Sequence, residues 1–391
     1  MSDSAGAARR CEIRAAGGPE RARTVRPDGD FLQRALAASR SCGVTRLADI
    51  TGLDRLGLPV WQAVRPAGRA LSVHQGKGAS HEDARIGALC EAMESHCAEN
   101  APADGPRCSF AALPLAERAQ QLGDYCRNRD SVPGLAEEVQ WCAAADLLTG
   151  RRLWLPHALV SLDYTSGLPS LFERSSLGLG AGPQQTSALG TSLLEVIERD
   201  SMGAWDRLDR ASKVESSVQP KTIPFGWFQA WCARFAALDV GLKIFSVETI
   251  VGVAAFKCVI GGAAEFGESY RRFSGSAAHG DPEIALFKAL AEAMQSRLTL
   301  IAGARDDILP SYYARPPASA RVGANSSQRG RPWAATEPVP CDAVTLAEGL
   351  AAAGYPQVAV KRLDEGLEGV SVTKAFVAGL GSLTRTRRTA R

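Results

Sequence analysis

The spacing of apolar residues divides the chain into a few long amphipathic stretches and many short β-rich runs. Helical periodicity predicts helices over residues 30–41, 81–100, 186–206, 282–301 and 345–353. Runs rich in branched and aromatic residues predict strands at residues 58–64, 69–74, 138–144, 153–162, 242–250, 251–260, 358–362 and 370–377. The alternation of helices and strands indicates an α/β or α+β fold.

Three further segments are expected to be tails or connections. Residues 1–29 are polar and show no hydrophobic periodicity, which predicts a flexible N-terminal tail. Residues 314–340 are rich in Pro, Gly, Ser and Arg, and we expect a mobile loop there. The basic residues 384–391 are expected to form a frayed tail.

Composition excludes several classes of protein. The 391 residues include 45 Lys and Arg against 42 Asp and Glu, a net charge of +3, which argues against a nucleic-acid or membrane partner recruited by bulk charge. The ten cysteines form no C-x-x-C pair and the five histidines are dispersed, so neither a zinc site nor a disulfide framework is indicated. No secretory signal or membrane-spanning run is present, and we expect a reduced, soluble, cytoplasmic protein.

Three of the expected helices repeat one spacing of small and acidic residues. In the first copy Gly78 is followed after 6, 13 and 16 residues by Ala84, Glu91 and Glu94. In the second copy Gly182 is followed at the same intervals by Ala188, Glu195 and Glu198. The third copy lacks the glycine and has Ala285, Glu292 and Gln295, after the small-residue segment Ser274-Gly275-Ser276.

The repeated E-x-x-E pattern places two carboxylates on one face of each of two helices. Four converging carboxylates repel one another unless cations neutralise them, and their hard oxygens suit Mg²⁺. Lys77, Arg199 and the glycine-rich loops before the helices offer an ammonium, a guanidinium and backbone amides to phosphate oxygens. The pattern therefore suggests a Mg²⁺–ATP site, although two solvated helix faces following glycine turns would have the same pattern.

Four segments resemble the ordered motifs of YcaO-domain proteins. Residues 75–99, QGKGASHEDARIGALCEAMESHCAE, resemble the first motif, and residues 179–205, LGAGPQQTSALGTSLLEVIERDSMGAW, resemble the second. Residues 292–307, EAMQSRLTLIAGARDD, are similar to the third, and residues 44–66, VTRLADITGLDRLGLPVWQAVRP, to the opening region. The resemblance implies a YcaO-like α+β catalytic domain over residues 30–383, built from strand–glycine loop–helix units around a central nucleotide site.

The resemblance also implies an activity and its cofactors. YcaO-type enzymes use ATP and Mg²⁺ to phosphorylate the oxygen of a backbone amide in a ribosomally made peptide. Phosphorylation turns a poor leaving group into a good one, and the attacking group decides whether an azoline, a thioamide or a macrocyclic amidine forms. No residue of this chain is assigned as a nucleophile, because the peptide or an external sulfide brings the attacking group.

Individual roles carry over at the matching motif positions. The Mg²⁺ ligands implied by the resemblance are Glu91, Glu94, Glu195 and Glu198. The residues implied to hold ATP are Lys77, Arg199, Glu292, Gln295, Arg297 and Arg305. The opening region most resembles members that are encoded with TfuA-type partners or that work alone. The implied partners are therefore a precursor peptide and a TfuA-like or other protein, and a homodimer is compatible because members often pair.

Two positions depart from the family pattern. Members usually have Asn early in the second loop and Glu eight residues before the first Glu of E-x-x-E, where this chain has Pro183 and Ser187. These departures favour an alternative, a non-catalytic YcaO-like scaffold that binds a precursor peptide or a partner subunit. The carboxylates and cations that match the motifs favour the enzyme.

Overall fold

A computed structural model describes residues 17–19, 30–119, 137–167, 171–262, 272–314 and 330–380. The predicted helices are all present, within a few residues of the expected ends. The helices are α2 (Phe31–Ser41), α3 (His81–Glu99), α4 (His157–Val160), α5 (Gln185–Asp206), α6 (Arg210–Glu215), α7 (Gly226–Ala237), α8 (Pro282–Ala302), α9 (Pro310–Ala314) and α10 (Ala343–Ala352). The predicted tail at 384–391 lies outside the described residues, as do nearly all of the tail at 1–29 and the part of the predicted loop at 315–329.

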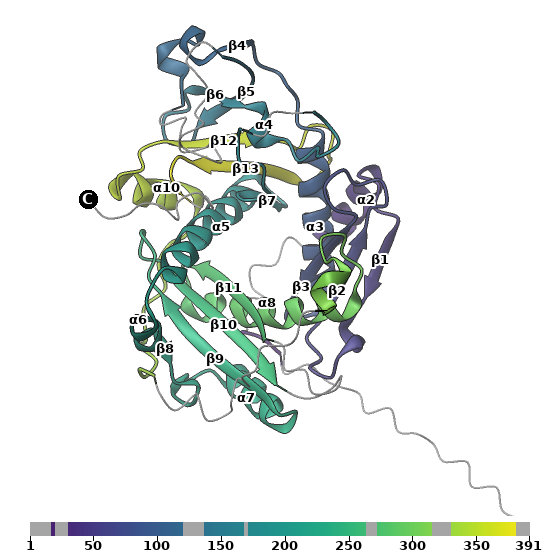
Figure 1. Ribbon diagram of the computed structural model, residues 1–391, viewed down its shortest axis with the longest axis vertical. Helices are drawn as coiled ribbons and strands as arrows, with labels where there is room; N and C mark the ends of the chain where they lie inside the picture. The colour runs from purple at the N-terminus through teal and green to yellow at the C-terminus, as the bar shows by residue number, and fades with distance from the viewer. Residues whose placement is uncertain are drawn as a thin grey trace, which may run out of the picture.

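The strands form three sheets (Figure 1). One has the order β1-β2-β3, from Arg46–Asp49, Val60–Val64 and Val73–Lys77. The second has the order β11-β10-β9-β8, from Arg272–His279, Ala254–Gly262, Val240–Val247 and Ser217–Val218. The third has the order β4-β5-β12-β13-β7, from Arg107–Ser109, Glu138–Asp146, Val358–Arg362, Ser371–Val377 and Leu179–Gly182, with β6 (Arg152–Pro156) paired to β5.

The structure corrects the expected strand and loop boundaries at several places. The strand predicted at 69–74 begins only at Val73 and continues to Lys77, and the one predicted at 153–162 gives way to α4 at His157. The small-residue segments expected as loops at 76–78, 178–182 and 274–276 lie largely in β3, β7 and β11. One glycine in each of these strands, Gly76, Gly180 and Gly275, is needed for packing against a helix rather than for a turn.

The three long helices and the strands before them form a repeated unit. β3, β7 and β11 are each the edge strand of a sheet, and each leads into a helix that packs back on it, respectively α3, α5 and α8. Each helix also packs on the edge strand of the next unit, α3 on β7, α5 on β11 and α8 on β3. The units therefore close into a ring, with three helices and three edge strands around one central region (Figure 1).

A glycine in each edge strand permits this close packing. A Cβ on Gly76 would lie 2.1 Å from both Ala84 O and Ala88 N of α3. A Cβ on Gly180 would lie 2.3 Å from Ala188 O of α5. The third unit repeats the contact one turn further along its helix, because a Cβ on Gly275 would meet Ala289 O and Ala293 N of α8.

Replacing Gly76 by Ala is therefore expected to destabilise the protein. The added methyl group collides with helix backbone that has no rotamer to change, so the strand must move away from α3, at a cost of about 1–3 kcal/mol. Denaturant unfolding measures the loss. Gly52→Ala is the matched control, since no atom lies within 4 Å of its Cβ position, and equal stabilities of the two variants would contradict the packing argument.

Three apolar clusters support the ring. One lies between α2, α3 and the six-stranded sheet, and includes Leu89, Met93 and Trp141. A second packs α7 and α8 against the β8–β11 sheet, and a third packs α5 and α10 against neighbouring strands. Among the described residues, none of the helices combines the length and the apolar character that crossing a bilayer requires.

Candidate functional site

Two glutamates bind the strand region that precedes their own helix. Glu91 on α3 accepts a hydrogen bond of 3.1 Å at Oε2 from the backbone N–H of Gln75 in β3. Glu195 on α5 accepts one of 3.1 Å at Oε2 from the backbone N–H of Gly178, directly before β7. An edge strand has unpaired backbone groups on one side, and here these groups hold carboxylates at the centre of the ring.

The second glutamate of each E-x-x-E pair reaches the strand of the next unit. Glu94 accepts a hydrogen bond from the backbone N–H of Ala181 in β7. Glu198 accepts one of 2.7 Å at Oε1 from the hydroxyl of Ser276 in β11. The two pairs therefore connect three consecutive units, and the four carboxylates predicted from the sequence lie within electrostatic reach of one another.

The third unit completes the ring with one glutamate and one glutamine in place of two glutamates. Glu292 on α8 lies at the position of Glu91 and Glu195, and its Oε2 is 3.5 Å from the Lys77 ammonium at the end of β3. Gln295 occupies the position of Glu94 and Glu198 and is buried. The site therefore consists of five carboxylates and one amide, which we call the carboxylate ring: Glu91, Glu94, Glu195, Glu198, Glu292 and Gln295.

Burial and mutual repulsion disfavour the ionised form of the glutamates in the carboxylate ring. Burial, with the neighbouring Glu198 and Glu91 charges, raises the pKa of Glu195 to about 7. Burial and the Glu292 charge raise the pKa of Glu198 to about 7 as well. Burial also raises the pKa of Glu91, and with the Glu91 and Glu195 charges it raises that of Glu94 well above the usual range. At neutral pH the ring is therefore poised to bind cations.

The ring lies in a concave, solvent-reached part of the protein. Glu91 is exposed, yet desolvation by surrounding protein is the largest cause of its raised pKa. Lys288 on α8 is likewise exposed, while desolvation lowers its pKa. A side chain that water reaches and protein surrounds lines a depression, which is the shape that a bound small molecule needs.

Several cations lie at the carboxylate ring. Arg199 Nε is 3.9 Å from Glu195 Oε1, and the three nearby carboxylates raise the pKa of its guanidinium. The Lys77 charge lowers the pKa values of Glu91 and Glu198. A two-point contact with Asp307, at 2.9 and 2.6 Å, raises the pKa of Arg305, and the Glu91 charge adds to that shift.

Arg297, a candidate for holding ATP, makes a buried ion pair that the sequence motif did not indicate. Its Nε is 3.2 Å from Asp54 Oδ2 in a buried ion pair, and its guanidinium lies 5.8 Å from the centre of the Phe273 ring. A cation already neutralised in the interior supports the fold, so we do not include Arg297 among the phosphate-binding residues proposed below.

Sequence reasoning missed Lys288, Ser276 and Lys374. Lys288 stands one helical turn before Glu292 on the same face of α8, an i,i+4 signal that was available. Lys374 in β13 is buried, and its ammonium donates to the carbonyls of Leu159, Val160 and Ser175. Burial lowers the Lys374 pKa to about 7, and the Glu195 charge opposes that shift.

The donor set fits Mg²⁺ and a polyphosphate. Hard carboxylate oxygens are the ligands Mg²⁺ takes, and Lys77, Lys288 and Arg199 suit phosphate oxygens. The backbone lies close to the first turn of the helix at both Gly78 and Gly182. A Cβ would lie 2.3 Å from Asp83 Cβ at the start of α3, and 3.0 Å from Ser187 Cβ at the start of α5. Among the described residues, no three Asp, Glu, His or Cys side chains are close enough together to enclose a metal ion. Each carboxylate of the E-x-x-E pairs is held by its own donor, so the four face one region without meeting at a single point.

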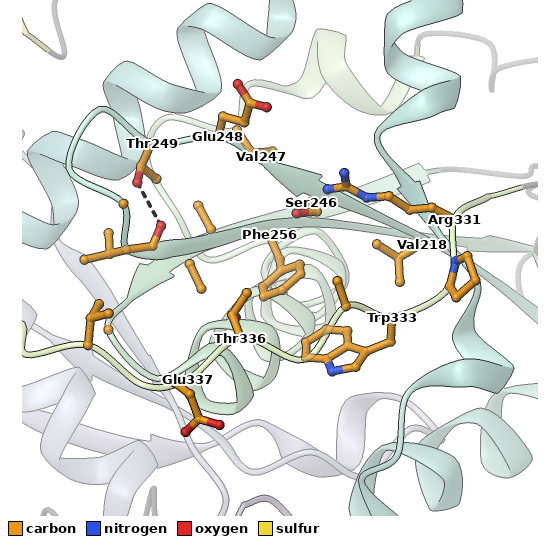
Figure 2. Close-up of a pocket in the computed structure, with 18 residues that line it drawn as sticks. Val218, Ser246, Val247, Glu248, Thr249, Phe256, Arg331, Trp333, Thr336 and Glu337 are labelled. Atoms are coloured by element: carbon orange, nitrogen blue, oxygen red, sulfur yellow. Dashed lines mark hydrogen bonds between the residues drawn. The ribbon is translucent and has the colours of Figure 1, made fainter.

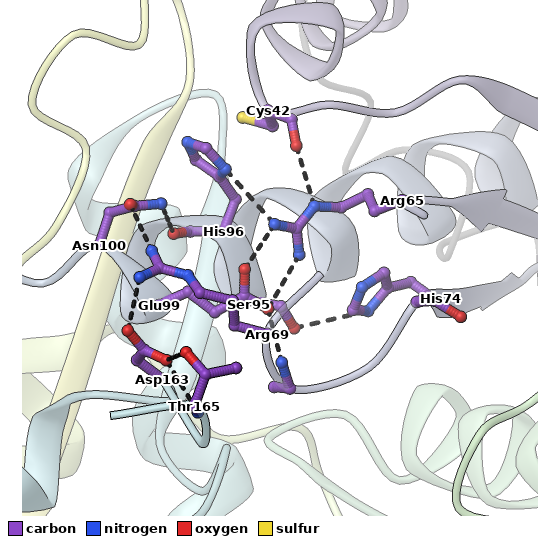
Figure 3. A network of polar contacts seen from close by, with 12 residues as sticks. Cys42, Arg65, Arg69, His74, Ser95, His96, Glu99, Asn100, Asp163 and Thr165 are labelled. Atoms are coloured by element: carbon purple, nitrogen blue, oxygen red, sulfur yellow. Dashed lines mark hydrogen bonds and ion pairs between the residues drawn. The ribbon is translucent and has the colours of Figure 1, made fainter. Parts of the chain in front are cut away.

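A second polar network fixes the β2–β3 connection beside the ring (Figure 3). The Arg65 guanidinium contacts Glu99 at 2.7 and 3.3 Å, and its Nε donates to the Cys42 carbonyl at 2.9 Å. Glu99 Oε1 also accepts the backbone N–H of Ala70 at 3.0 Å. Each partner in this buried pair is therefore satisfied, and the chain entering β3 is held against the end of α3.

The raised pKa values predict how stability depends on pH and Mg²⁺. In unfolded chains Glu195 and Glu198 titrate near 4.5, and in the folded protein near 7. Between these values the folded state binds more protons, so without divalent cations stability falls as pH rises from about 4.5 to 7 and levels off above. Mg²⁺ is expected to raise the unfolding midpoint by roughly 2–5 °C at pH 8 and much less at pH 5.

Thermal unfolding in EDTA and in Mg²⁺ across this pH range tests that expectation. The control is the double variant Glu195→Gln/Glu198→Gln, which loses the two titrating groups and is expected to show a flatter profile. An equal Mg²⁺ effect at pH 5 and pH 8 would contradict the assignment of these groups.

A known family model matches the part of the chain that contains the three repeated units. Residues 75–381 match the family model described as YcaO cyclodehydratase, ATP- and Mg²⁺-binding. A Rhizobium leguminosarum bv. trifolii protein encoded in the tfuA 3′ region is 32% identical over 363 residues, which cover 87% of this chain and 84% of the relative. The resemblance drawn from four sequence segments is therefore confirmed, as are the expected cofactors ATP and Mg²⁺.

Solved structures share the fold. YcaO from Methanopyrus kandleri bound with AMPPCP and Mg²⁺ is 22% identical, with a TM-score of 0.64 and coverage of 90% of each chain. A heterocyclase in complex with substrate and cofactor is 19% identical with a TM-score of 0.67, over 89% of this chain. This chain spans about half, 52%, of that heterocyclase. The predicted α+β fold class is confirmed.

Proposed function

This chain belongs to the YcaO family, and we propose that it uses ATP and Mg²⁺ to activate a backbone amide of a ribosomally made peptide. The observation that carries this proposal is the carboxylate ring, in which five carboxylates from three helices face one region and influence one another's pKa values, with cations around them. Ionised carboxylates placed this close repel one another. A bound cation would neutralise that repulsion, and this is the best explanation for a fold that places five of them around one region.

The metal ligands in this proposal are Glu91, Glu94, Glu195 and Glu198. Cation binding lowers the pKa values that crowding has raised, so all four are ionised when Mg²⁺ is bound. Gln75 N–H, Gly178 N–H and Ser276 Oγ orient three of these carboxylates from outside the metal shell. The edge strands therefore position the ligands, and the helices supply them.

The phosphate-binding residues in this proposal are Lys77, Lys288, Arg199 and Arg305. Glu292 pairs with Lys77 at 3.5 Å and holds its ammonium at the ring. Asp306 fixes the segment that carries Arg305, because its carboxylate accepts the backbone N–H and the hydroxyl of Ser72 at 2.7 and 2.6 Å. When bound, ATP supplies the phosphoryl group that makes the amide oxygen a leaving group, and Mg²⁺ spreads the developing charge.

The product class follows from the group that attacks the activated carbon. A Cys, Ser or Thr side chain of the peptide gives an azoline, a peptide amine gives a macrocyclic amidine, and sulfide gives a thioamide. The heterocyclase similar in fold was solved with substrate, and the Rhizobium relative is encoded beside tfuA. On that basis we propose a precursor peptide as substrate and a TfuA-like protein as partner.

A second candidate function is a non-catalytic scaffold that holds such a peptide or partner. Pro183 and Ser187 replace the Asn and Glu usual in the family. Ser187 is exposed in the first turn of α5, a turn without an acidic residue and with no side-chain cap at Gln184. One carboxylate fewer at this end of the site weakens metal binding and is the observation that favours the scaffold.

Calorimetric titration of the wild-type protein with ATP separates the two functions. We expect saturable binding in Mg²⁺ and at least about tenfold weaker binding in EDTA, because the ring repels an uncompensated triphosphate. Folded protein that binds no ATP in either buffer, alone or with a TfuA-like partner, would overturn the enzyme proposal and leave the scaffold.

A further inference from the structure

A cysteine and a histidine meet between α5 and α8. Cys341 Sγ lies 3.9 Å from His279 Nε2. His279 Nδ1 accepts the backbone N–H of Asp281 at 3.0 Å, so the proton of the neutral ring is on Nε2 and faces the sulfur. Within the described ranges, no other cysteine contacts an imidazole.

The contact is built into the fold. A Cβ on Gly280 would lie 2.1 Å from Val339 O and 3.0 Å from Cys341 Sγ, and the Val339 N–H donates to Gly280 O at 3.0 Å. The Cys341 carbonyl also lies near Gly190 of α5, 3.7 Å from where its Cβ would stand. The segment before α10 is therefore pressed against both helices, with the thiol on the imidazole.

The thiol has a polar, cationic setting next to the carboxylate ring. Lys288 lies within electrostatic reach of Cys341, Glu198 and Glu292, each of which raises its pKa against burial. Burial and the Lys288 charge lower the pKa of His279 to about 4, so at pH 7 this ring is a neutral N–H donor. The Cys341 sulfur therefore lies against an N–H donor, with the Lys288 ammonium in electrostatic reach.

A cavity of about 460 Å³ lies near the segments that carry the pair. Figure 2 shows its lining at the ends of β9 and β10 and along the segment that contains Trp333 and Thr336. Gly280 and Val339, the two residues joined by the backbone hydrogen bond, also line it. The cavity therefore reaches the backbone of the two segments that carry His279 and Cys341, while the imidazole and the thiol themselves are not part of its lining.

From these contacts we infer that Cys341 accepts sulfane sulfur as a persulfide and presents it to the activated amide. This inference rests on the proposed function and assigns it the thioamide as product. Cys341 Sγ attacks the outer sulfur of a persulfide donor, whose S–S bond breaks as the donor leaves as a thiolate. The outer sulfur on Cys341 then attacks the activated amide carbon, and phosphate departs with the amide oxygen.

The sulfur must finally leave Cys341, which requires a reductant. A low-molecular-weight thiol attacks Cys341 Sγ, and the S–S electron pair stays on the peptide sulfur to give the thioamide. A second thiol releases Cys341 from the mixed disulfide. Two thiols are thereby oxidised to a disulfide, and the sulfane sulfur is reduced to the level of sulfide.

Inorganic polysulfide is the probe for the first step. The folded protein is exposed briefly to it, trapped with an alkylating agent, digested and analysed for one added sulfur at each cysteine. We expect Cys341 to gain sulfur about ten times faster than Cys108, a half-buried matched thiol, and His279→Ala to remove most of that difference. Equal rates at the two cysteines, or an unchanged Cys341 rate in folded His279→Ala, would overturn the inference.

The assay needs no ATP, so its result is independent of the calorimetric titration. Failed labelling in protein that binds Mg²⁺–ATP removes the sulfur-carrier role alone. Selective labelling in protein that binds no ATP upholds the persulfide at Cys341 and overturns its delivery to an activated amide.

Discussion

Glu195→Gln is expected to weaken the binding of Mg²⁺–ATP by about 100-fold or more. Glu195 is coupled to carboxylates of two units: its charge raises the pKa of Glu94, and the charges of Glu198 and Glu91 raise its own pKa. Glutamine removes the charge that a divalent cation requires. Calorimetric titration with ATP in Mg²⁺, repeated at several Mg²⁺ concentrations, measures the loss.

The substitution is suited to this test because it keeps the fold. The glutamine oxygen still accepts the Gly178 N–H, and one repulsive charge in the ring disappears. The variant is therefore expected to be at least as stable as the wild type in EDTA, while gaining less from Mg²⁺. Weak binding by a stable variant identifies lost ligation rather than unfolding.

Glu348→Gln is the matched control, since Glu348 is an exposed glutamate on α10. It is expected to bind Mg²⁺–ATP like the wild type. If Glu195→Gln and Glu348→Gln bind equally well, the carboxylate ring is not the metal site, and the assignment of Glu91, Glu94, Glu195 and Glu198 fails as a set.

The long helices and their acidic residues are predictable from the sequence because the signals are local. Helical periodicity sets the extent of α3, α5 and α8, and the E-x-x-E spacing puts two carboxylates on one face. The repeat of that spacing also suggests convergence. The closed ring cannot be predicted from these local signals, because it depends on each helix contacting the edge strand of the next unit.

The glycine-rich segments show where prediction from local sequence gives the wrong secondary structure. Glycine-rich stretches before helices predict loops, yet Gly76, Gly180 and Gly275 lie in edge strands. Their role is to let a strand lie on helix backbone, a contact between elements that spacing within one segment does not encode. Two consequences of this packing, the backbone donors to Glu91 and Glu195, were therefore absent from the prediction.

Arg297 and Lys288 show the same limit for single side chains. Both stand on α8 near Glu292, and the family motif points to Arg297. Which of them reaches the ring is decided by the direction of each side chain from the helix, and Asp54, which binds Arg297, is 243 residues away in the sequence. Only the assembled fold separates a structural cation from one at the site.

The second large effect is expected for Glu99→Gln, with a loss of about 3–5 kcal/mol in the free energy of unfolding. Glu99 and Arg65 are both nearly inaccessible to solvent, with side-chain exposures of 1% and 3%. The substitution leaves the guanidinium charge in the interior with no carboxylate beside it. Denaturant unfolding of the wild type and the variant measures the difference.

Two controls separate the buried charge from the lost hydrogen bonds. Glu138→Gln breaks the pair with Arg107, whose side chains are 65% and 73% exposed, and is expected to cost at most about 1 kcal/mol. The double variant Arg65→Met/Glu99→Leu removes both buried charges and is expected to be more stable than Glu99→Gln, although the Ala70 N–H and the Cys42 carbonyl lose their partners. A double variant less stable than the single one would mean that these backbone contacts, rather than charge pairing, hold the chain that leads into β3 and to Lys77.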